Sequence, residues 1–222
     1  MKSHAEIWPL FGLRVTCGEL ELTAIRDDDI PSMVALVESG IHDPDAMPFA
    51  YPWTEAPDLV RNTARYYWRT RAEFEPAKWT LDFAVRRNGE LVGTQGFATV
   101  DYAVTRTGET GSWLARRFQE HGIGTAMRRV ACAFLFDHLG AAEITSAAWV
   151  DNPASLAVSR KVGYVDNGRF REKRRVGEAT ISCKLLLTPE TFIRPREQVV
   201  VEGLAPVREW LGLEQLDEPG PS

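Results

Sequence analysis

A short glycine-containing segment has the residues needed to bind a phosphate group through its backbone. It runs from Gln119 to Thr125 in the order Gln-Glu-His-Gly-Ile-Gly-Thr, between a strand-like run and a helical run. A turn here leaves backbone N–H groups unpaired at a helix N-terminus, where they and the helix dipole attract anions. Gly122 and Gly124 carry no Cβ, so a ligand can approach the main chain closely. The segment therefore predicts a phosphate or pyrophosphate site.

A second strand-to-helix junction follows at 150–155. Asn152 is a favoured helix N-cap, and Pro153 suits the first helical position. Consecutive parallel β-α units place such junctions at the same edge of a sheet. The Asn152 amide and the Ser155 hydroxyl suit an amide-bearing arm. A pyrophosphate joined to an amide-bearing arm that ends in a thiol is coenzyme A, which is the ligand we expect.

Hydrophobic periodicity indicates the elements that must position these junctions. They are a strand at 20–24, a helix beginning near Pro31, a helix over 60–68 with Val60, Tyr67 and Trp68 at helical spacing, a hairpin of 81–85 and 91–100, a strand at 109–114, a helix ending at Gly140, a strand at 144–150, a helix ending at Gly163, and strands at about 164–173 and 179–187. We expect an α+β domain over 1–188. Residues 189–222 are expected to form a C-terminal extension with a short strand at 199–201, a weak helix at 208–211 and a disordered end from Leu216.

The composition limits the class of protein. Of the 222 residues, 44% are hydrophobic and 26% are charged, as in ordinary globular proteins. No run of about 18 apolar residues is present and the N-terminus lacks an apolar signal core, so we expect a cytoplasmic protein that binds no membrane. The net charge of −5 argues against nucleic acid as a partner. Three well-separated cysteines suggest reduced thiols, and no metal is expected.

The motifs resemble those of a known family. The pattern Q-x-x-G-x-G at 119–124, followed by N-x-x-S-x-x-x-S-x-x-x-G-Y at 152–164, is similar to the GNAT acetyltransferase family. Within it, the RimJ/RimL-like branch, which modifies protein N-termini and various small amines, is the most similar. Gly-Ser-Trp-Leu at 111–114 also resembles that branch. The resemblance covers about residues 12–188.

The resemblance implies a fold and a binding mode. The fold would be a mixed, mostly antiparallel sheet whose splayed central strands hold acyl-CoA, flanked by helices. The amides of 119–125 would bind the pyrophosphate, the backbone N–H of Leu114 would polarise the thioester carbonyl, and Asn152 would bind the pantetheine arm. The cofactor-binding residues expected are Trp113, Leu114, Gln119, Glu120, His121, Gly122, Ile123, Gly124, Thr125, Asn152, Ser155 and Ser159.

An amine acceptor must lose a proton before it attacks. An α-amino group with a pKa near ~8 is already about a tenth neutral at pH 7, so a modest base or a water relay suffices. Glu109, on the strand that enters the site, is the candidate base. The alternative is that Glu109 is a solvent-facing strand carboxylate, and Asp101 is a weaker candidate.

Three further groups have two interpretations each. Ser159 stands where many family members have a tyrosine, and it either donates to the leaving sulfur or bonds its own helix backbone. A Pro-rich loop at 41–56 carries three aromatic residues, which either line the acceptor-binding site or pack in the core. These are Phe49, Tyr51 and Trp53. The basic residues Arg169, Arg171, Lys173 and Arg175 alternate along a strand and should share one face, either solvated or attracting an acidic group.

The leading expectation is an N-acyltransferase that moves acetyl from acetyl-CoA to a primary amine by direct attack. Succinyl-CoA or another short acyl-CoA is an alternative donor, and the acceptor is a protein N-terminus or a small-molecule amine. A non-catalytic CoA-binding module remains open because of the serine at 159. A nucleotide-binding domain is disfavoured, because GxxxxGK[ST] is missing. A homodimer follows only from the resemblance.

Overall fold

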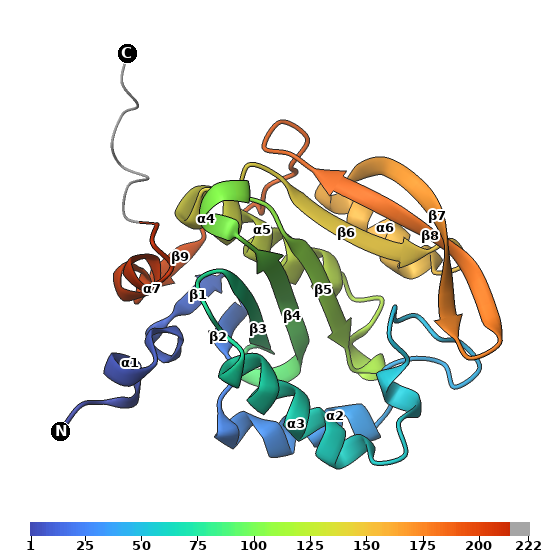
Figure 1. Cartoon of the computed structure of the whole chain (residues 1–222), viewed down its shortest axis with the longest axis horizontal. Coiled ribbons are helices and arrows are strands. Elements are labelled where there is room, and N and C mark those ends of the chain that lie inside the picture. The colour runs from blue at the N-terminus through green and yellow to red at the C-terminus, as the bar shows by residue number, and fades with distance from the viewer. Residues whose placement is uncertain (214–222) are drawn as a thin grey trace.

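A computed structural model describes residues 1–213, in which nine strands form one sheet (Figure 1). The sheet order is β7-β8-β6-β5-β4-β3-β2-β1-β9. The strands are β1 (Arg14–Cys17), β2 (Leu20–Ala24), β3 (Lys78–Arg87), β4 (Glu90–Val100), β5 (Glu109–Leu114), β6 (Ile144–Trp149), β7 (Val165–Arg175), β8 (Glu178–Leu187) and β9 (Val200–Glu202).

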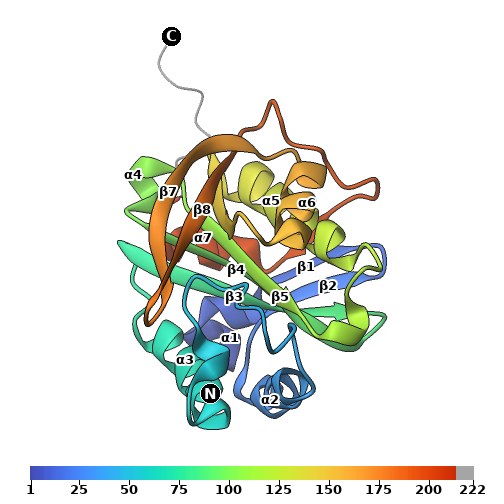
Figure 2. The same cartoon turned by 90° about the vertical axis from the view of Figure 1, so that its right-hand side faces the viewer.

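Helices cover both faces of this sheet (Figure 2). Helices α5 and α6 lie on one face, over the main hydrophobic core, while α2 and α3 lie on the other face over a smaller cluster. The helices are α1 (His4–Ile7), α2 (Ile30–Glu38), α3 (Leu59–Ala72), α4 (Tyr102–Thr105), α5 (Ile123–Leu139), α6 (Pro153–Val162) and α7 (Leu204–Trp210). Among residues 1–213, no helix has the length and apolar character needed to cross a membrane.

The sheet opens between β5 and β6. These strands are the one parallel pair within the described chain, and they are in register at a single pair, Glu109 with Thr145. Past that point β5 and β6 diverge, as Figure 1 shows. We call the opening between them the seam. The predicted fold class, a mostly antiparallel sheet with splayed central strands, is confirmed.

The segment after 188 adds to the same sheet. Strand β9 pairs antiparallel with β1 at the sheet edge, so the predicted short strand exists one residue later than expected. Helix α7 packs its Trp210 on Trp8 and Phe74, with ring centroids 4.7 and 4.6 Å apart. The end of the chain from Leu216, expected to be disordered, lies outside the described residues.

Two local expectations differ from the structure. The helix predicted over 60–68 is present as α3, but Val60 and Trp68 are exposed, while Thr63 and Tyr67 are its buried residues. The sequence pattern also did not indicate the short elements β1, α1 and α4. An element of only four residues is too short to show a period.

Candidate functional site

Six backbone amides of the glycine segment are free. Within the described chain, the N–H groups of 120–125 donate to no protein acceptor. The N–H of Gln119 is not free, because it donates to the Arg116 carbonyl at 3.1 Å. The Gln119 side chain donates to the carbonyls of Ile41, at 2.7 Å, and Leu114, at 2.9 Å. Gln119 therefore ties the segment to its surroundings, and the free donors begin at Glu120.

The conformation of this segment explains the free amides. Glu120 and Gly122 both have a left-handed backbone, with φ of 64° and 77°, just before α5 begins at Ile123. Such a turn gathers successive N–H groups into an anion-binding concavity. The side chains of Glu120 and His121 are exposed, whereas Ile123 is buried and Thr125 half-buried. The His121 ring nitrogen Nδ1 lies 2.6 Å from the Gln119 carbonyl oxygen.

Gly124 packs closely between two elements. A Cβ at this position would lie 3.6 Å from Leu114 Cδ1 and 3.7 Å from Val158 Cγ2. These are ordinary contact distances, so a methyl group fits there but a large side chain does not.

The strand register directs two more amides into the seam. Gly93 is opposite Leu114, and Ala115 donates to the Val92 carbonyl at 3.1 Å, so Leu114 belongs to a non-hydrogen-bonded pair. Its N–H points away from β4 and toward the seam. The two-residue alternation gives the Ser112 N–H the same direction. Ser112 was not a predicted site residue, although this alternation could have indicated it.

Asn152 caps α6 with part of its side chain. Its Oδ1 accepts from the Ser155 backbone N–H at 3.0 Å. The capping bond uses only the amide oxygen, so within the described residues the amide NH₂ of Asn152 and the hydroxyl of Ser155 stay available to a ligand. Both residues are half-buried at the start of the helix that faces the seam.

Ser159 contacts a buried arginine that the sequence analysis did not place here. Arg128 of α5 donates to the hydroxyl oxygens of Ser159, at 3.1 Å, and Ser112, at 2.8 Å. Arg128 and Ser159 are only 4% and 0% exposed. Because the Ser159 oxygen accepts from Arg128 and is not engaged with its own helix backbone, its O–H remains a donor. Within the described chain, no acidic side chain pairs with Arg128, so this positive charge is available to an anion.

Only two of the three aromatic residues of the loop lie close together. Phe49 and Trp53 have ring centroids 5.3 Å apart, and Trp53 and Trp113 have centroids 6.3 Å apart. Trp113 packs against the cluster of buried residues that includes Tyr67 of α3. These rings lie on the α2/α3 face of the sheet. Tyr51 is 76% exposed and lies apart from them.

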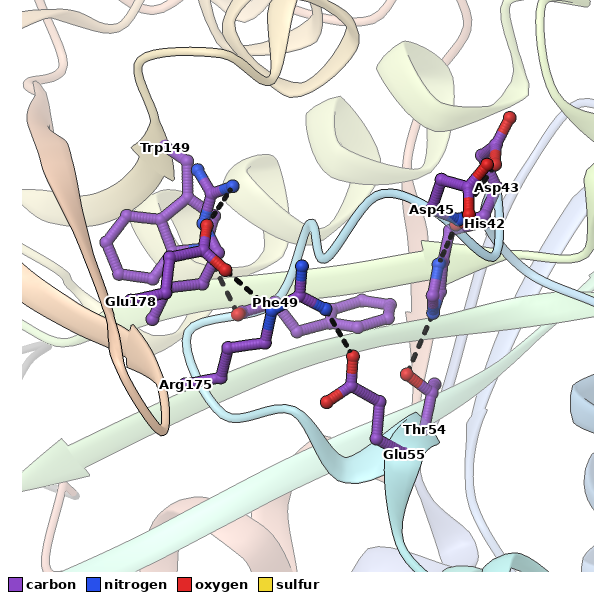
Figure 3. A network of polar contacts seen from close by, with 10 residues as sticks. His42, Asp43, Asp45, Phe49, Thr54, Glu55, Trp149, Arg175 and Glu178 are labelled. Carbon is purple, nitrogen blue, oxygen red and sulfur yellow. Dashed lines mark hydrogen bonds and ion pairs between the residues drawn. The ribbon is translucent and has the colours of Figure 1, made fainter.

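A polar network holds the loop across the seam (Figure 3). The Trp149 indole of β6 donates to the Phe49 carbonyl at 3.1 Å. From the β7–β8 hairpin, Arg175 donates to Glu55 of the loop at 2.6 Å and to Glu178 at 2.6 Å. The loop is thus attached to the elements on the far side of the seam.

The expected row of basic side chains on β7 is interrupted. A register shift between Lys173 and Arg175 breaks the two-residue alternation, so the prediction that all four share one face was wrong at Arg175. The residue inside the shift, Arg174, is buried and pairs with Asp151 and Glu178.

Glu109 stands at the closed end of the seam. It is exposed and is the residue of β5 that pairs with Thr145. It lies five positions before Leu114, which is about 17 Å along a strand. Its side chain lies on the same face of the sheet as Gly111 and the Trp113 side chain, because alternate residues of a strand face the same way. Asp101 follows the end of β4, beyond Glu109.

A carboxylate on that same face was not predicted. Asp82 of β3 is half-buried, and its Oδ2 is buried without a hydrogen-bond partner among residues 1–213. Burial raises its pKa from 3.8 to about 6, and a hydrogen bond from the Tyr66 hydroxyl opposes part of that rise. Among residues 1–213, no group of three or more His, Cys, Asp or Glu side chains is placed to hold a metal ion.

Comparisons with known proteins agree with this arrangement. An Acetyltransferase (GNAT) domain model matches residues 19–165. A Bacillus subtilis protein named "Putative ribosomal N-acetyltransferase YdaF" is 32% identical over 85 residues, which are 38% of this chain and 46% of that protein. The chain therefore aligns with less than half of that relative's length.

Solved structures share the fold. Mycobacterium smegmatis RimJ, in complex with CoA-disulfide, has a TM-score of 0.65 and 19% identity, over 82% of this chain and 89% of that one. RimL, a ribosomal L7/L12 alpha-N-protein acetyltransferase in complex with coenzyme A, has a TM-score of 0.65 and 17% identity, over 77% and 94%. The predicted resemblance to the GNAT family is confirmed by the matching domain model, and the solved structures of RimJ and RimL share the fold. The chain belongs to the GNAT acetyltransferase family.

Proposed function

We infer that the protein transfers an acyl group, acetyl in the simplest case, from acyl-CoA to a primary amine. The observation that carries this proposal is the set of free amides that line an open seam. Six of them lie at 120–125, and those of Ser112 and Leu114 point into the seam from β5. Such donors suit a pyrophosphate at one end and a thioester carbonyl at the other.

Each part of the seam has a proposed role. The amides of 120–125 hold the diphosphate, and the Asn152 side-chain NH₂ bonds the amide-bearing arm. The N–H groups of Leu114 and Ser112 polarise the thioester carbonyl, because negative charge grows on that oxygen as the amine attacks. Gln119 supports the loop through its two side-chain hydrogen bonds.

Ser159 and Arg128 are proposed to stabilise the leaving sulfur. The guanidinium fixes the Ser159 oxygen as an acceptor, and this leaves the hydroxyl hydrogen to be donated to the departing thiolate. The buried positive charge also favours that anion, since charge interactions are strong where water is excluded. A serine can therefore replace the tyrosine found in many family members.

The acceptor is proposed to enter from the α2/α3 face, beside Phe49, Trp53 and Trp113. The names of YdaF and RimL refer to ribosomal acceptors, which makes a protein N-terminus the first candidate. A small-molecule amine remains the second candidate, and succinyl-CoA or another short acyl-CoA remains an alternative donor. The role of residues 1–188 as the acyltransferase domain is part of this proposal.

The test is thiol release by the purified protein. Acetyl-CoA and succinyl-CoA would each be combined with peptides that carry a free α-amine, with spermidine and with simple alkylamines, and acylated products would be identified by mass spectrometry. The proposal predicts release that depends on an amine. CoA-dependent thermal stabilisation without release from any pair would instead indicate a CoA-binding module.

A further inference from the structure

The middle of the sheet has an open space above it on the α2/α3 face. Asp82 is opposite Gly96 on β4, and Gly96 is opposite Gly111 on β5, so the three share one face. Gly111 is exposed, and a Cβ built on it would meet no atom within 4 Å. An exposed glycine inside a nine-stranded sheet marks an open space above β5, one residue from the seam-facing amide of Ser112.

The Asp82 carboxylate lies at the side of this space. A Cβ on Gly96 would be only 2.5 Å from Asp82 Oδ1, so the carboxylate occupies the volume above Gly96. The Tyr66 hydroxyl lies close enough to the carboxylate to lower its pKa. Its Oδ2 is buried and has no partner in the described chain. Burying a carboxylate oxygen without a donor is costly, so such an atom calls for a donor that is absent when the protein is alone.

The charged and titratable groups around Asp82 leave it available to a cation. From α3, the facing groups are Tyr66 and Tyr67, with Arg69 close enough to act on Tyr66. Partial burial and the Asp82 charge raise the pKa of Tyr66, which therefore stays a neutral donor. From β5, Glu109 is the acidic residue on the same face. Asp82 forms no ion pair with any arginine or lysine in residues 1–213.

We propose that Asp82 binds the ammonium form of the acceptor above Gly111 and receives the proton that the amine must lose. The inference rests on the acyl transfer proposed above, and it defines the acceptor as a primary amine that arrives as a cation. The carboxylate accepts hydrogen bonds from the ammonium group. The aromatic rings of Trp113 and Trp53 flank the path by which the rest of the acceptor would enter.

The proton balance is complete. The ammonium nitrogen gives one proton to Asp82, and its freed electron pair forms the C–N bond to the thioester carbon. The C–S bond breaks, and its electron pair leaves on sulfur. The second proton lost by the nitrogen passes to this thiolate through the Ser159 hydroxyl or water. Asp82 then returns its proton to solvent, so that one amide, one thiol and one released proton are formed.

The first test measures binding without chemistry. Butylammonium would be titrated into the protein at pH 8 without CoA and followed by saturation-transfer NMR, with n-butanol as the uncharged probe. Asp82→Asn should weaken butylammonium binding by about tenfold or more, as expected when a charge-assisted hydrogen bond is lost, and leave butanol unchanged. Gly111→Val should weaken both probes by filling the space. Equal butylammonium binding by wild type and Asp82→Asn would overturn the proposal.

The second test uses the pH dependence of transfer. With Asp82 as the base, kcat/KM for the amine should form a plateau between about pH 6, set by the Asp82 pKa, and the amine pKa. In Asp82→Asn, kcat/KM should be about 100-fold lower than wild type within this pH range. It should also rise with unit slope up to the amine pKa instead of forming a plateau, because only the neutral amine then reacts. Glu109→Gln tests the competing base, and the plateau should persist in this variant if Asp82 is the base. Loss of the plateau in Glu109→Gln but not in Asp82→Asn would assign the base to Glu109.

The two tests separate the possible failures. If no amine is acylated but butylammonium binding still depends on Asp82, the acyl-transfer proposal fails and the ammonium site stands. If transfer occurs but neither binding nor the pH profile depends on Asp82, the ammonium site fails alone. Circular dichroism and CoA affinity would establish that both variants are folded.

Discussion

The two sides of the seam are built in different ways. The donor side consists of short continuous segments, in which the amides of 120–125 precede one helix and Asn152 caps the next. The acceptor side is assembled from Asp82 on β3, Gly111 on β5 and rings of a distant loop. Under the proposed function, mainly backbone groups hold the common cosubstrate, whereas side chains brought together by strand register meet the variable substrate.

The two sides should therefore differ in the amino-acid substitutions that they tolerate. A backbone site is damaged only by changes that fill it or alter its conformation. A site made of side chains changes with single substitutions, and the fold remains intact. Variants that fill the backbone site should thus act on CoA affinity, and variants of the acceptor-side side chains should act on the amine.

The largest effect is expected from Gly124→Trp. The indole does not fit between Leu114 and Val158, so it would fill the anion site and remove several charge-assisted hydrogen bonds. CoA affinity, measured by calorimetry, should fall by at least about 100-fold. Gly124→Ala is the control and should bind nearly normally, because its methyl group meets only ordinary contacts. Unchanged affinity in the tryptophan variant would place CoA elsewhere.

The Asp82→Asn variant should gain stability while it loses activity. The Asp82 pKa is raised from 3.8 to about 6 in the folded protein, so the stability that this carboxyl contributes is full below pH 3.8 and is lost as pH rises through 6. Asparagine does not titrate. The unfolding free energy of the variant relative to wild type should therefore rise between pH 4 and pH 7 by roughly 1–3 kcal/mol. A difference that is independent of pH would show that the carboxylate is well solvated.

Ser159→Ala should slow transfer on the donor side. It removes the hydroxyl proposed to bond the leaving sulfur and leaves the loop amides in place. We expect kcat to fall about tenfold, which is close to the free-energy contribution of one hydrogen bond. CoA affinity should be nearly unchanged. Ser182→Ala, at a buried serine of β8, is the matched control. Full activity in the Ser159 variant would remove its role.

The smallest effect is expected from Glu55→Gln, which breaks the link between the loop and Arg175. Both side chains are partly exposed, so the pair contributes less than about 1 kcal/mol. KM for the amine should rise a few-fold while CoA affinity stays the same. Asp58→Asn breaks an exposed pair with Arg61 as the control. An equal change in both variants would mean that the loop link has no specific role.

The sequence predicted the donor side well because its signals are local. The glycine segment, the Asn152 cap and the helix end at Gly140 each depend on residues adjacent in the chain, and all three are present. The N-cap role of Asn152 follows from residue type alone.

The acceptor side could not be predicted in the same way. Asp82 looks like any polar residue in an alternating strand until the register places Gly96 beside it and Gly111 beyond. Arg128 looks like a surface helix residue until α5 packs it toward Ser112 and Ser159. On β7, the register shift near Arg174 has no local sequence signal and changes which arginine is buried.

The most direct test of the seam as the CoA site is amide hydrogen exchange, with and without CoA, at single-residue resolution by NMR. The free amides at 120–125, together with those of Ser112 and Leu114, should exchange much more slowly once CoA is bound, while the α2/α3 face changes little. Protection that leaves these amides unchanged and appears on another surface would contradict the account.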